Sequence, residues 1–143
     1  MNAAPFKIRG CHWIDVPGAQ DERGRLNFME QGRGLDFAPA RLFWLHHVRP
    51  GQWRGRHGHR RCRLVLVAMA GRCRIHLDDG TVRQAATLDD PARALHVGPL
   101  VWHELTDFDP GASVLVIAST PFDEADYLRD YEQFCREARQ LRP

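Results

Sequence analysis

The 143-residue sequence contains a single lysine, Lys7, against nineteen arginines, so guanidinium groups carry almost all of its positive charge. Eighteen acidic residues leave a formal net charge of only +2, which is unlike the strongly basic composition of nucleic-acid-binding proteins. We therefore expect no nucleic-acid partner. Arginine binds phosphate oxygens in a bidentate way, and the composition stays compatible with an anionic small ligand.

The sequence also lacks a C-x-x-C pair, an apolar stretch typical of a signal peptide, and any run of ~20 apolar residues that could cross a bilayer. Its four scattered cysteines indicate reduced thiols in a cytoplasmic protein with no membrane partner. It has no fixed-period repeat. With 43% hydrophobic and 27% charged residues, it is sized for one globular domain over residues 1–143.

Short apolar segments separated by turn-forming residues run from about residue 5 to residue 118. Between two of them, Asp79 and Gly80 predict a two-residue hairpin turn, because such turns need positive φ. Many short strands are typical of an all-β sandwich or barrel. The segments expected to form strands are residues 7–14, 26–30, 41–48, 62–70, 73–77, 81–88, 94–97, 101–105 and 113–118.

After Pro121 the apolar residues recur at intervals of three and four, which is the spacing of an amphipathic helix. We predict one C-terminal α-helix over about residues 122–141, with acidic residues in its first turn and arginines toward its end. The predicted architecture is all-β, a jelly roll or small β-barrel with this helix packed on the outside.

Two histidines, His57 and His59, stand at positions i and i+2 just ahead of the apolar run 64–70. In a strand the period of two points both imidazoles to the same face. Neighbouring groups that titrate near pH ~6.5 suit either metal binding or proton transfer. Arginines surround the pair in sequence, and those that share its pocket would favour neutral imidazole and stabilise a developing oxyanion.

The spacing around these histidines resembles the general cupin pattern Gly-x5-His-x-His. His103 corresponds to the third histidine ligand of metal-dependent cupins, but the position of their glutamate ligand is Leu64 here. Leu64 cannot coordinate a metal, although three imidazoles alone hold zinc in some enzymes. The loss of one ligand favours a metal-free acid–base pair over a metal centre.

A closer resemblance appears in residues 54–60 (RGRHGHR), which resemble the R-G-x-H-A-H-K signature of the nucleotide-sugar 3,4-ketoisomerases. These are cupins that act on dTDP-4-keto-6-deoxyglucose. The likeness covers about residues 15 to 135 in order, through residues 21–26 (DERGRL), 71–80 (GRCRIHLDDG), 87–91 (TLDDP), 96–104 (HVGPLVWHE) and 122–131 (FDEADYLRDY).

The resemblance implies an isomerase that moves the keto group of a dTDP-linked 6-deoxy-hexose from C4 to C3 through an enediol, in deoxyaminosugar biosynthesis. Relatives use no metal and no organic cofactor. His59 is the leading candidate for the base at C3, and His57 for the partner that returns a proton at C4, with the two roles open to exchange.

Further residues match pocket positions of the family or lie close to them in sequence. Arg41 and Arg54 are candidates to bind the sugar or the diphosphate, and His103 is expected beside the other two imidazoles. Trp102 is a candidate to stack on thymine, and Asp107 to bind ribose or orient a histidine.

Members of the family form homodimers that exchange N-terminal strands between subunits. This exchange would bring Arg23 and Gly24 to the active site of the partner. The Arg-Gly pair resembles family members that release the 3-keto product with the galacto configuration.

Some family residues are replaced: a Tyr-Tyr pair by Phe43 and Trp44, a glutamine by Leu64, the alanine between the histidines by Gly58 and the lysine after them by Arg60. Three alternative functions therefore stay open. They are a dTDP-sugar 3,5-epimerase, a metal-dependent cupin oxygenase that uses the three histidines, and a non-catalytic sugar-binding cupin.

Overall fold

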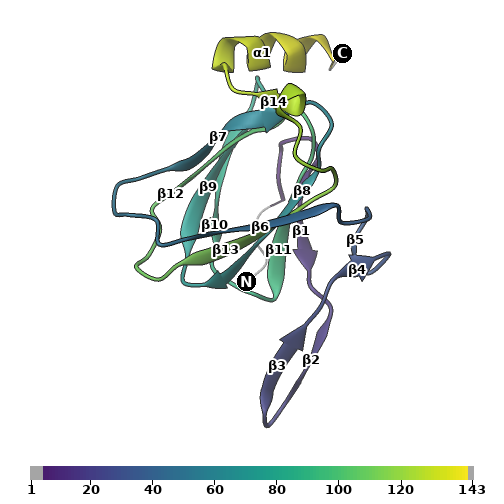
Figure 1. Cartoon of the computed structure of the whole chain (residues 1–143), viewed down its shortest axis with the longest axis vertical. Coiled ribbons are helices and arrows are strands. Elements are labelled where there is room, and N and C mark those ends of the chain that lie inside the picture. Colours follow the sequence, from purple (N-terminus) through teal and green to yellow (C-terminus); the bar gives the residue numbers. More distant parts are fainter. Residues whose placement is uncertain (1–4, 142–143) are drawn as a thin grey trace.

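A computed structural model describes residues 5–141, which form two five-stranded antiparallel sheets (Figure 1). The ends of the predicted domain, residues 1–4 and 142–143, lie outside the described residues. The first sheet has the order β1 (Cys11–Asp15), β11 (Arg93–Val97), β8 (Leu64–Ala70), β13 (Ser113–Ala118) and β6 (Arg41–His46). The second has the order β10 (Arg83–Leu88), β9 (Cys73–Asp78), β12 (Trp102–Thr106), β7 (Arg54–His59) and β14 (Tyr127–Leu128).

The prediction of an all-β, cupin-type jelly roll is confirmed, but within residues 5–141 the two sheets do not join into a closed barrel. Strands that are neighbours in a sheet are mostly distant in sequence, as when β8 pairs with both β11 and β13. This order is typical of a double-sheet roll, in which the chain crosses repeatedly from one sheet to the other.

Alternation along β8 divides the apolar core into two parts. Leu64, Leu66 and Ala68 point between the sheets into the main core. Val65 and Val67 point to the opposite face, where Leu35 and Phe37 and other residues of the N-terminal segment cover them. The segment between β1 and β6 therefore covers the outside of the first sheet.

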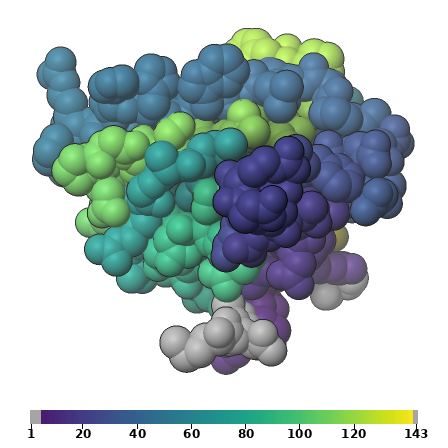
Figure 2. All heavy atoms as spheres, turned by 90° about the horizontal axis from the view of Figure 1, so that it is seen from below, coloured from purple at the N-terminus to yellow at the C-terminus, as the bar shows by residue number. Residues whose placement is uncertain are grey.

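Part of that N-terminal segment projects from the body as a hairpin of β2 (Gly18–Asp21) and β3 (Gly24–Asn27). Every residue of both strands is exposed. Figure 1 shows the hairpin at the opposite end of the molecule from the C-terminal helix, and Figure 2, viewed from the hairpin's side, shows it in the foreground. Two short strands, β4 (Glu30–Gln31) and β5 (Gly34–Leu35), follow it.

The predicted hairpin at Asp79 and Gly80 joins β9 to β10, but its turn is longer than the two residues expected. The turn spans residues 79–82, and the Asp79 carboxylate accepts hydrogen bonds from the backbone N–H groups of Thr81 and Val82. An aspartate that bonds its own turn in this way stabilises the wider loop.

The C-terminal helix is shorter than predicted. α1 covers Tyr131–Gln140, while residues 124–126 form the 3-10 turn η1 (Glu124–Asp126) and Tyr127 and Leu128 form β14. The helix begins at Tyr131 because the Asp130 side chain accepts the backbone N–H of Gln133 as an N-cap. α1 has ten residues and is too short to cross a bilayer. No other helix within residues 5–141 is longer than α1.

Candidate active site

β7 carries a β-bulge that sets the direction of its side chains. His57 pairs with His103 and Gly55 pairs with Glu104, so Arg56 is the extra residue between them. Gly55 and Arg56 both have positive φ, +91° and +62°. The bulge changes the phase of alternation and leaves Arg56 on the outer face, where its Nε lies 3.1 Å from a Glu104 carboxylate oxygen.

Three imidazoles meet at the inner face of the second sheet. His57 and His59 point to the same side of β7, as the spacing predicts, and their ring centroids are 5.1 Å apart. His103 from β12 lies 4.6 Å from the His57 ring and 5.9 Å from the His59 ring. His59 and His103 are buried and His57 is partly buried. The structure thus brings together the three histidines that sequence analysis selected.

Burial keeps these imidazoles neutral. It lowers the pKa of His57 to about 4, with further lowering by the charge of His59. Burial also lowers the pKa of His59 to about 4, although the Asp126 carboxylate acts in the opposite direction. The pKa of His103 falls to about 3 because this ring is fully enclosed. At neutral pH all three rings therefore offer a lone pair and can accept a proton.

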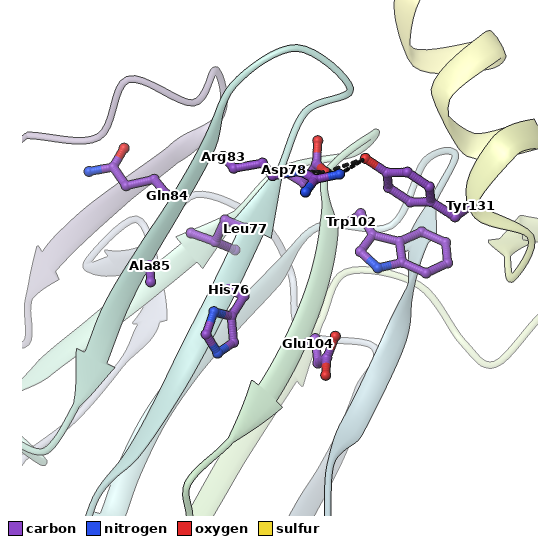
Figure 3. Close-up of a pocket in the computed structure, with 9 residues that line it drawn as sticks. All are labelled: His76, Leu77, Asp78, Arg83, Gln84, Ala85, Trp102, Glu104 and Tyr131. Atoms are coloured by element: carbon purple, nitrogen blue, oxygen red, sulfur yellow. Dashed lines mark hydrogen bonds and ion pairs between the residues drawn. The ribbon is translucent and has the colours of Figure 1, made fainter.

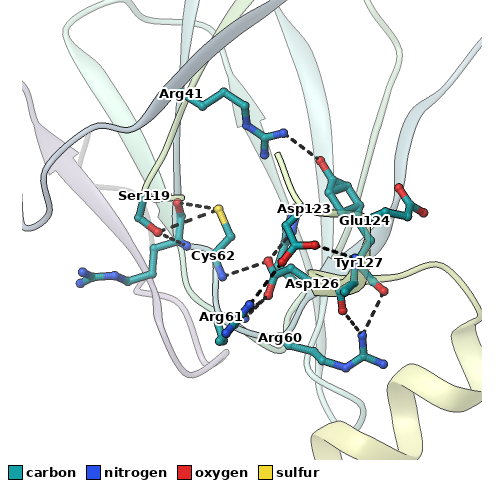
Figure 4. Close-up of polar contacts among 12 residues, drawn as sticks. Arg41, Arg60, Arg61, Cys62, Ser119, Asp123, Glu124, Asp126 and Tyr127 are labelled. Carbon is teal, nitrogen blue, oxygen red and sulfur yellow. Dashed lines mark hydrogen bonds and ion pairs between the residues drawn. The ribbon is translucent and has the colours of Figure 1, made fainter. Parts of the chain in front are cut away.

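Tyr127 covers the histidines from the C-terminal segment. It pairs with His59 across β14 and β7, and its ring centroid lies 4.4 Å from that of His59 and 4.9 Å from that of His57. Its hydroxyl accepts a 3.4 Å hydrogen bond from Arg41 of β6, shown in Figure 4. The Arg129 guanidinium also lies over the tyrosine ring, 4.4 Å from its centroid.

Two polar atoms beside this cluster are buried and make no hydrogen bond: Nε of Arg41 and Nδ1 of His57. Buried polar groups in folded proteins are almost always paired, so unpaired ones mark places where a ligand can supply the partner. One donor and one ring nitrogen are available here for a polar ligand.

Other predicted site residues lie farther from the imidazoles. The register places Arg54 opposite Leu105, which is the inner side of the sheet, but its side chain is exposed at the start of β7. Asp107 is exposed and accepts a hydrogen bond from Thr106. Arg23 is bonded to Asp21 in the projecting hairpin, with Gly24 beside it, and neither contacts the imidazoles of its own chain. The substrate-binding roles of these four residues therefore stay predictions.

Trp102 lies on the opposite face of β12 from His103, because adjacent residues of a strand point to opposite sides. Its ring packs against Tyr131 and Phe134 of α1, with centroids 5.2 and 5.5 Å away. It contributes to an outer groove of about 520 Å³, in which Tyr131 and Arg83 both bond the Asp78 carboxylate (Figure 3). The three imidazoles lie on the other side of the sheet from this groove.

Sequence analysis missed Asp126 and Tyr127 as site residues because it assigned both to the C-terminal helix. Asp126 lies behind His59, with its Oδ2 3.2 Å from Nδ1 of the ring. The signal available in the sequence was the resemblance of residues 122–131 to the family, which marked the segment without giving either residue a role.

The three imidazoles are also close enough for a metal ion, since one ring nitrogen from each lies within 4.8 Å of the others. The fourth position of the cupin pattern, Leu64, is buried in the core between the sheets. A metal would therefore have three imidazoles and no carboxylate from that position, a poorer set than the cupin pattern supplies.

Comparison with known proteins agrees with this arrangement. Residues 9–139 match the FdtA family, described as WxcM-like, C-terminal. The TDP-4-oxo-6-deoxy-α-D-glucose-3,4-oxoisomerase of Aneurinibacillus thermoaerophilus is 41% identical over 114 residues, which cover 80% of this chain and 82% of that protein.

Two solved structures have the same fold and related sequences. QdtA, a sugar 3,4-ketoisomerase from Thermoanaerobacterium thermosaccharolyticum in complex with TDP, has a TM-score of 0.92 and 31% identity, covering 95% of this chain and 99% of QdtA. The TDP-quinovose 3,4-ketoisomerase WlaRB from Campylobacter jejuni has a TM-score of 0.86 and 33% identity, covering 90% and 99%. The chain therefore belongs to the FdtA family, within the group of cupin-fold sugar 3,4-ketoisomerases.

Proposed function

We propose that this chain is an isomerase that converts TDP-4-keto-6-deoxyglucose into a TDP-3-keto-6-deoxyhexose. The observation that carries the proposal is the cluster of three neutral imidazoles beside Arg41 and Tyr127, in a chain 41% identical to a TDP-4-oxo-6-deoxyglucose 3,4-oxoisomerase. Such a reaction needs a group that accepts a proton from carbon and polar groups that stabilise the oxygen.

The chemistry is a balanced exchange of two protons. The hydrogen on C3 leaves as a proton, the C3–C4 enediol forms, and a proton is added to C4. At the same time the hydroxyl proton on O3 is lost and O4 gains one, so a ketone at C4 becomes a ketone at C3. No electrons enter or leave the sugar, and the reaction needs no external oxidant.

We assign the carbon proton transfers to the pair on β7. His59 is the proposed base at C3 and His57 the proposed donor at C4, although the 5.1 Å separation of their rings allows the opposite assignment. Arg41 and Tyr127 are the proposed hydrogen-bond donors to the substrate oxygens, and the unpaired Nε–H of Arg41 supports this role. His103 is the third imidazole that we expect to contact the sugar.

The proposed reaction uses no metal. This part of the proposal rests on Leu64, an aliphatic side chain in the core at the position where metal-dependent cupins carry a carboxylate. Elemental analysis of protein purified without chelator tests it: near-stoichiometric iron, manganese or zinc, lost together with activity on chelation, would support the alternative of a metal-dependent cupin.

We further propose a homodimer in which the β2–β3 hairpin reaches the partner subunit, with Arg23 and Gly24 near the partner's site and a galacto-configured product. Support comes from the exposure of the whole hairpin and from apolar side chains on the outer face of the first sheet. Leu42, Trp44 and Met69 are 57%, 62% and 53% exposed there. Light scattering measures the mass, and Trp44→Glu is expected to yield monomer.

The oxidation state of the cysteines indicates the cellular compartment of the protein. Cys62, Cys73 and Cys135 are buried and form no disulfide. Free thiols of this kind are typical of a reducing compartment, and a cytoplasmic location remains our proposal on that basis.

The function is tested by incubating the protein with TDP-4-keto-6-deoxyglucose in deuterated water and following the sugar by NMR. We expect a 3-keto product in which any deuterium taken up from the solvent is bound to C4. Exchange at C3 and C5 without movement of the keto group would instead identify a 3,5-epimerase. His57→Asn and His59→Asn are each expected to lower turnover by at least about 10²-fold while TDP still binds. Unchanged turnover in both variants would contradict the assigned roles, and TDP binding with no turnover in the parental protein would favour a non-catalytic binding protein.

A further inference from the structure

Asp126 is a buried carboxylate with four close donors. Its side chain is only 4% exposed. Oδ1 accepts the backbone N–H of Arg61 at 2.7 Å and lies 3.7 Å from the Arg61 guanidinium. Oδ2 lies 3.2 Å from the backbone nitrogen of Cys62 and 3.2 Å from Nδ1 of His59. Figure 4 shows the Asp126 carboxylate beside Arg61 and Cys62.

The geometry of this contact restricts the protonation of His59. An ionised carboxylate only accepts hydrogen bonds, and both backbone partners of Asp126 are donors. The His59 ring must therefore carry its proton on Nδ1, which leaves the lone pair on Nε2. Around that ring lie the imidazoles of His57 and His103 and the phenol of Tyr127.

We infer that Asp126 is a positioning residue that fixes His59 in the Nδ1–H tautomer and presents Nε2 to the sugar. The inference rests on the proposed function and deepens it by assigning the orientation of one of its two imidazoles. Orienting a histidine is one of the two roles that sequence analysis considered for Asp107, an exposed residue that accepts a hydrogen bond from Thr106 and whose own role stays a prediction. When His59 holds a proton from carbon, the carboxylate stabilises the resulting imidazolium.

Asp126 reaches this place through the 3-10 turn that separates it from α1. Asp123 caps that turn by accepting the N–H of Ala125, and the carbonyl of Asp126 accepts the N–H of Arg60. The backbone of Asp126 is thus hydrogen-bonded to the residue that follows His59, which fixes the position of the carboxylate beside the imidazole. This rigidity suits a group whose function is to hold another side chain.

The inference is tested first in the unaltered protein by ¹⁵N NMR of the histidine side chains, with His59 assigned by comparison with His59→Asn. We expect a protonated Nδ1 and an unprotonated Nε2 at pH 7. A dominant Nε2–H tautomer would overturn the inference. This measurement needs no turnover, so it stays informative even if the protein proves inactive on TDP-4-keto-6-deoxyglucose, a result that would contradict only the proposed function.

The second test is Asp126→Asn, which keeps the shape of the side chain and removes its charge. We expect kcat to fall by roughly 10- to 10²-fold while KM changes less than about threefold, together with an altered ¹⁵N pattern of His59. The matched control is Asp78→Asn, a similarly buried carboxylate that bonds Gly80, Arg83 and Tyr131 on the outer face. An Asp126→Asn protein with parental kcat, or with a loss equal to that of Asp78→Asn, would contradict the inference.

Discussion

Tyr127 lies directly opposite His59 in the antiparallel pairing of β14 with β7, with the two ring centroids 4.4 Å apart. One two-residue strand thereby places a phenol against two imidazoles and within 3.4 Å of the Arg41 guanidinium. The candidate site is therefore assembled from both sheets and from the C-terminal segment.

Replacing Tyr127 by phenylalanine removes the hydroxyl and keeps the ring. Loss of one hydrogen bond beside the substrate oxygens is expected to lower kcat/KM about fivefold, equal to about 1 kcal/mol of transition-state stabilisation. The other tyrosine of the chain gives the control: Tyr131→Phe loses its bonds to Asp78 and Arg83 on the outer face and is expected to leave kcat/KM unchanged. Equal effects of both substitutions would contradict the assignment.

Gly58 lies between the two histidines in β7, and its α-carbon faces Phe134 of α1. A Cβ added there would lie 3.0 Å from two ring carbons of Phe134 and 3.3 Å from the Val101 carbonyl oxygen. We expect Gly58→Ala to lower the free energy of unfolding by about 1 kcal/mol, because the buried phenylalanine must shift. Urea titration measures this loss, and Phe134→Leu in the same background is expected to restore part of it.

Arg60 connects β7 to the C-terminal segment. Its guanidinium bonds both oxygens of Glu137 at 2.9 and 3.0 Å and the carbonyl of Ala125 at 2.6 Å. Arg60→Ala is expected to cost about 2 kcal/mol of stability and to reduce activity, since the segment that carries Tyr127 loses its anchor. Faster amide exchange in residues 124–128 would show the detachment.

The control for this substitution is Arg72→Ala. Arg72 makes an exposed ion pair with Asp109, 3.5 Å apart, and such pairs contribute about 1 kcal/mol or less. If Arg60→Ala behaves like Arg72→Ala in both urea titration and amide exchange, the C-terminal segment does not depend on this anchor.

The three buried imidazoles predict that stability falls on acidification. Burial lowers the pKa values of His57 and His59 to about 4 and that of His103 to about 3, whereas an unfolded histidine titrates near ~6.5. Between these values the unfolded chain binds more protons, so the stability present near pH 7 is lost as pH falls from about 6.5 toward 4. Each such proton contributes a slope of about 1.4 kcal/mol per pH unit.

Urea titrations at pH 7, 6 and 5 measure this slope. His57→Asn is expected to make it shallower because one titrating group is lost. A free energy of unfolding that stays constant from pH 7 to pH 5 would show that the imidazoles are not held neutral in the folded protein.

The features that sequence predicted are those that depend on local periodicity. His57 and His59 share a face because alternation is a property of the strand itself. The side of the sheet occupied by Arg54 was not predictable, since it depends on a bulge at Arg56 that exists only in the pairing with β12. A single extra residue reverses the alternation on one side of it.

Asp126 and Tyr127 were missed for a related reason. Apolar residues at intervals of three and four occur both in a helix and in the turn, strand and helix that the structure contains here. What distinguishes them is the pairing of β14 with β7 and the hydrogen bond between His59 and Asp126, which are 67 positions apart in the sequence. No window of neighbouring residues holds that information.

The late position of β14 in the chain also has a consequence for biosynthesis. Nine of the ten strands in the two five-stranded sheets, all except β14, are translated before Asp126, and His59 is added to the chain 67 residues earlier. The sandwich can begin to fold while its site still lacks a phenol and a carboxylate. A nascent chain arrested before residue 126 would therefore hold most of the fold without the complete set of groups around His59, and enzymatic competence would arise only once Asp126 and Tyr127 have been added.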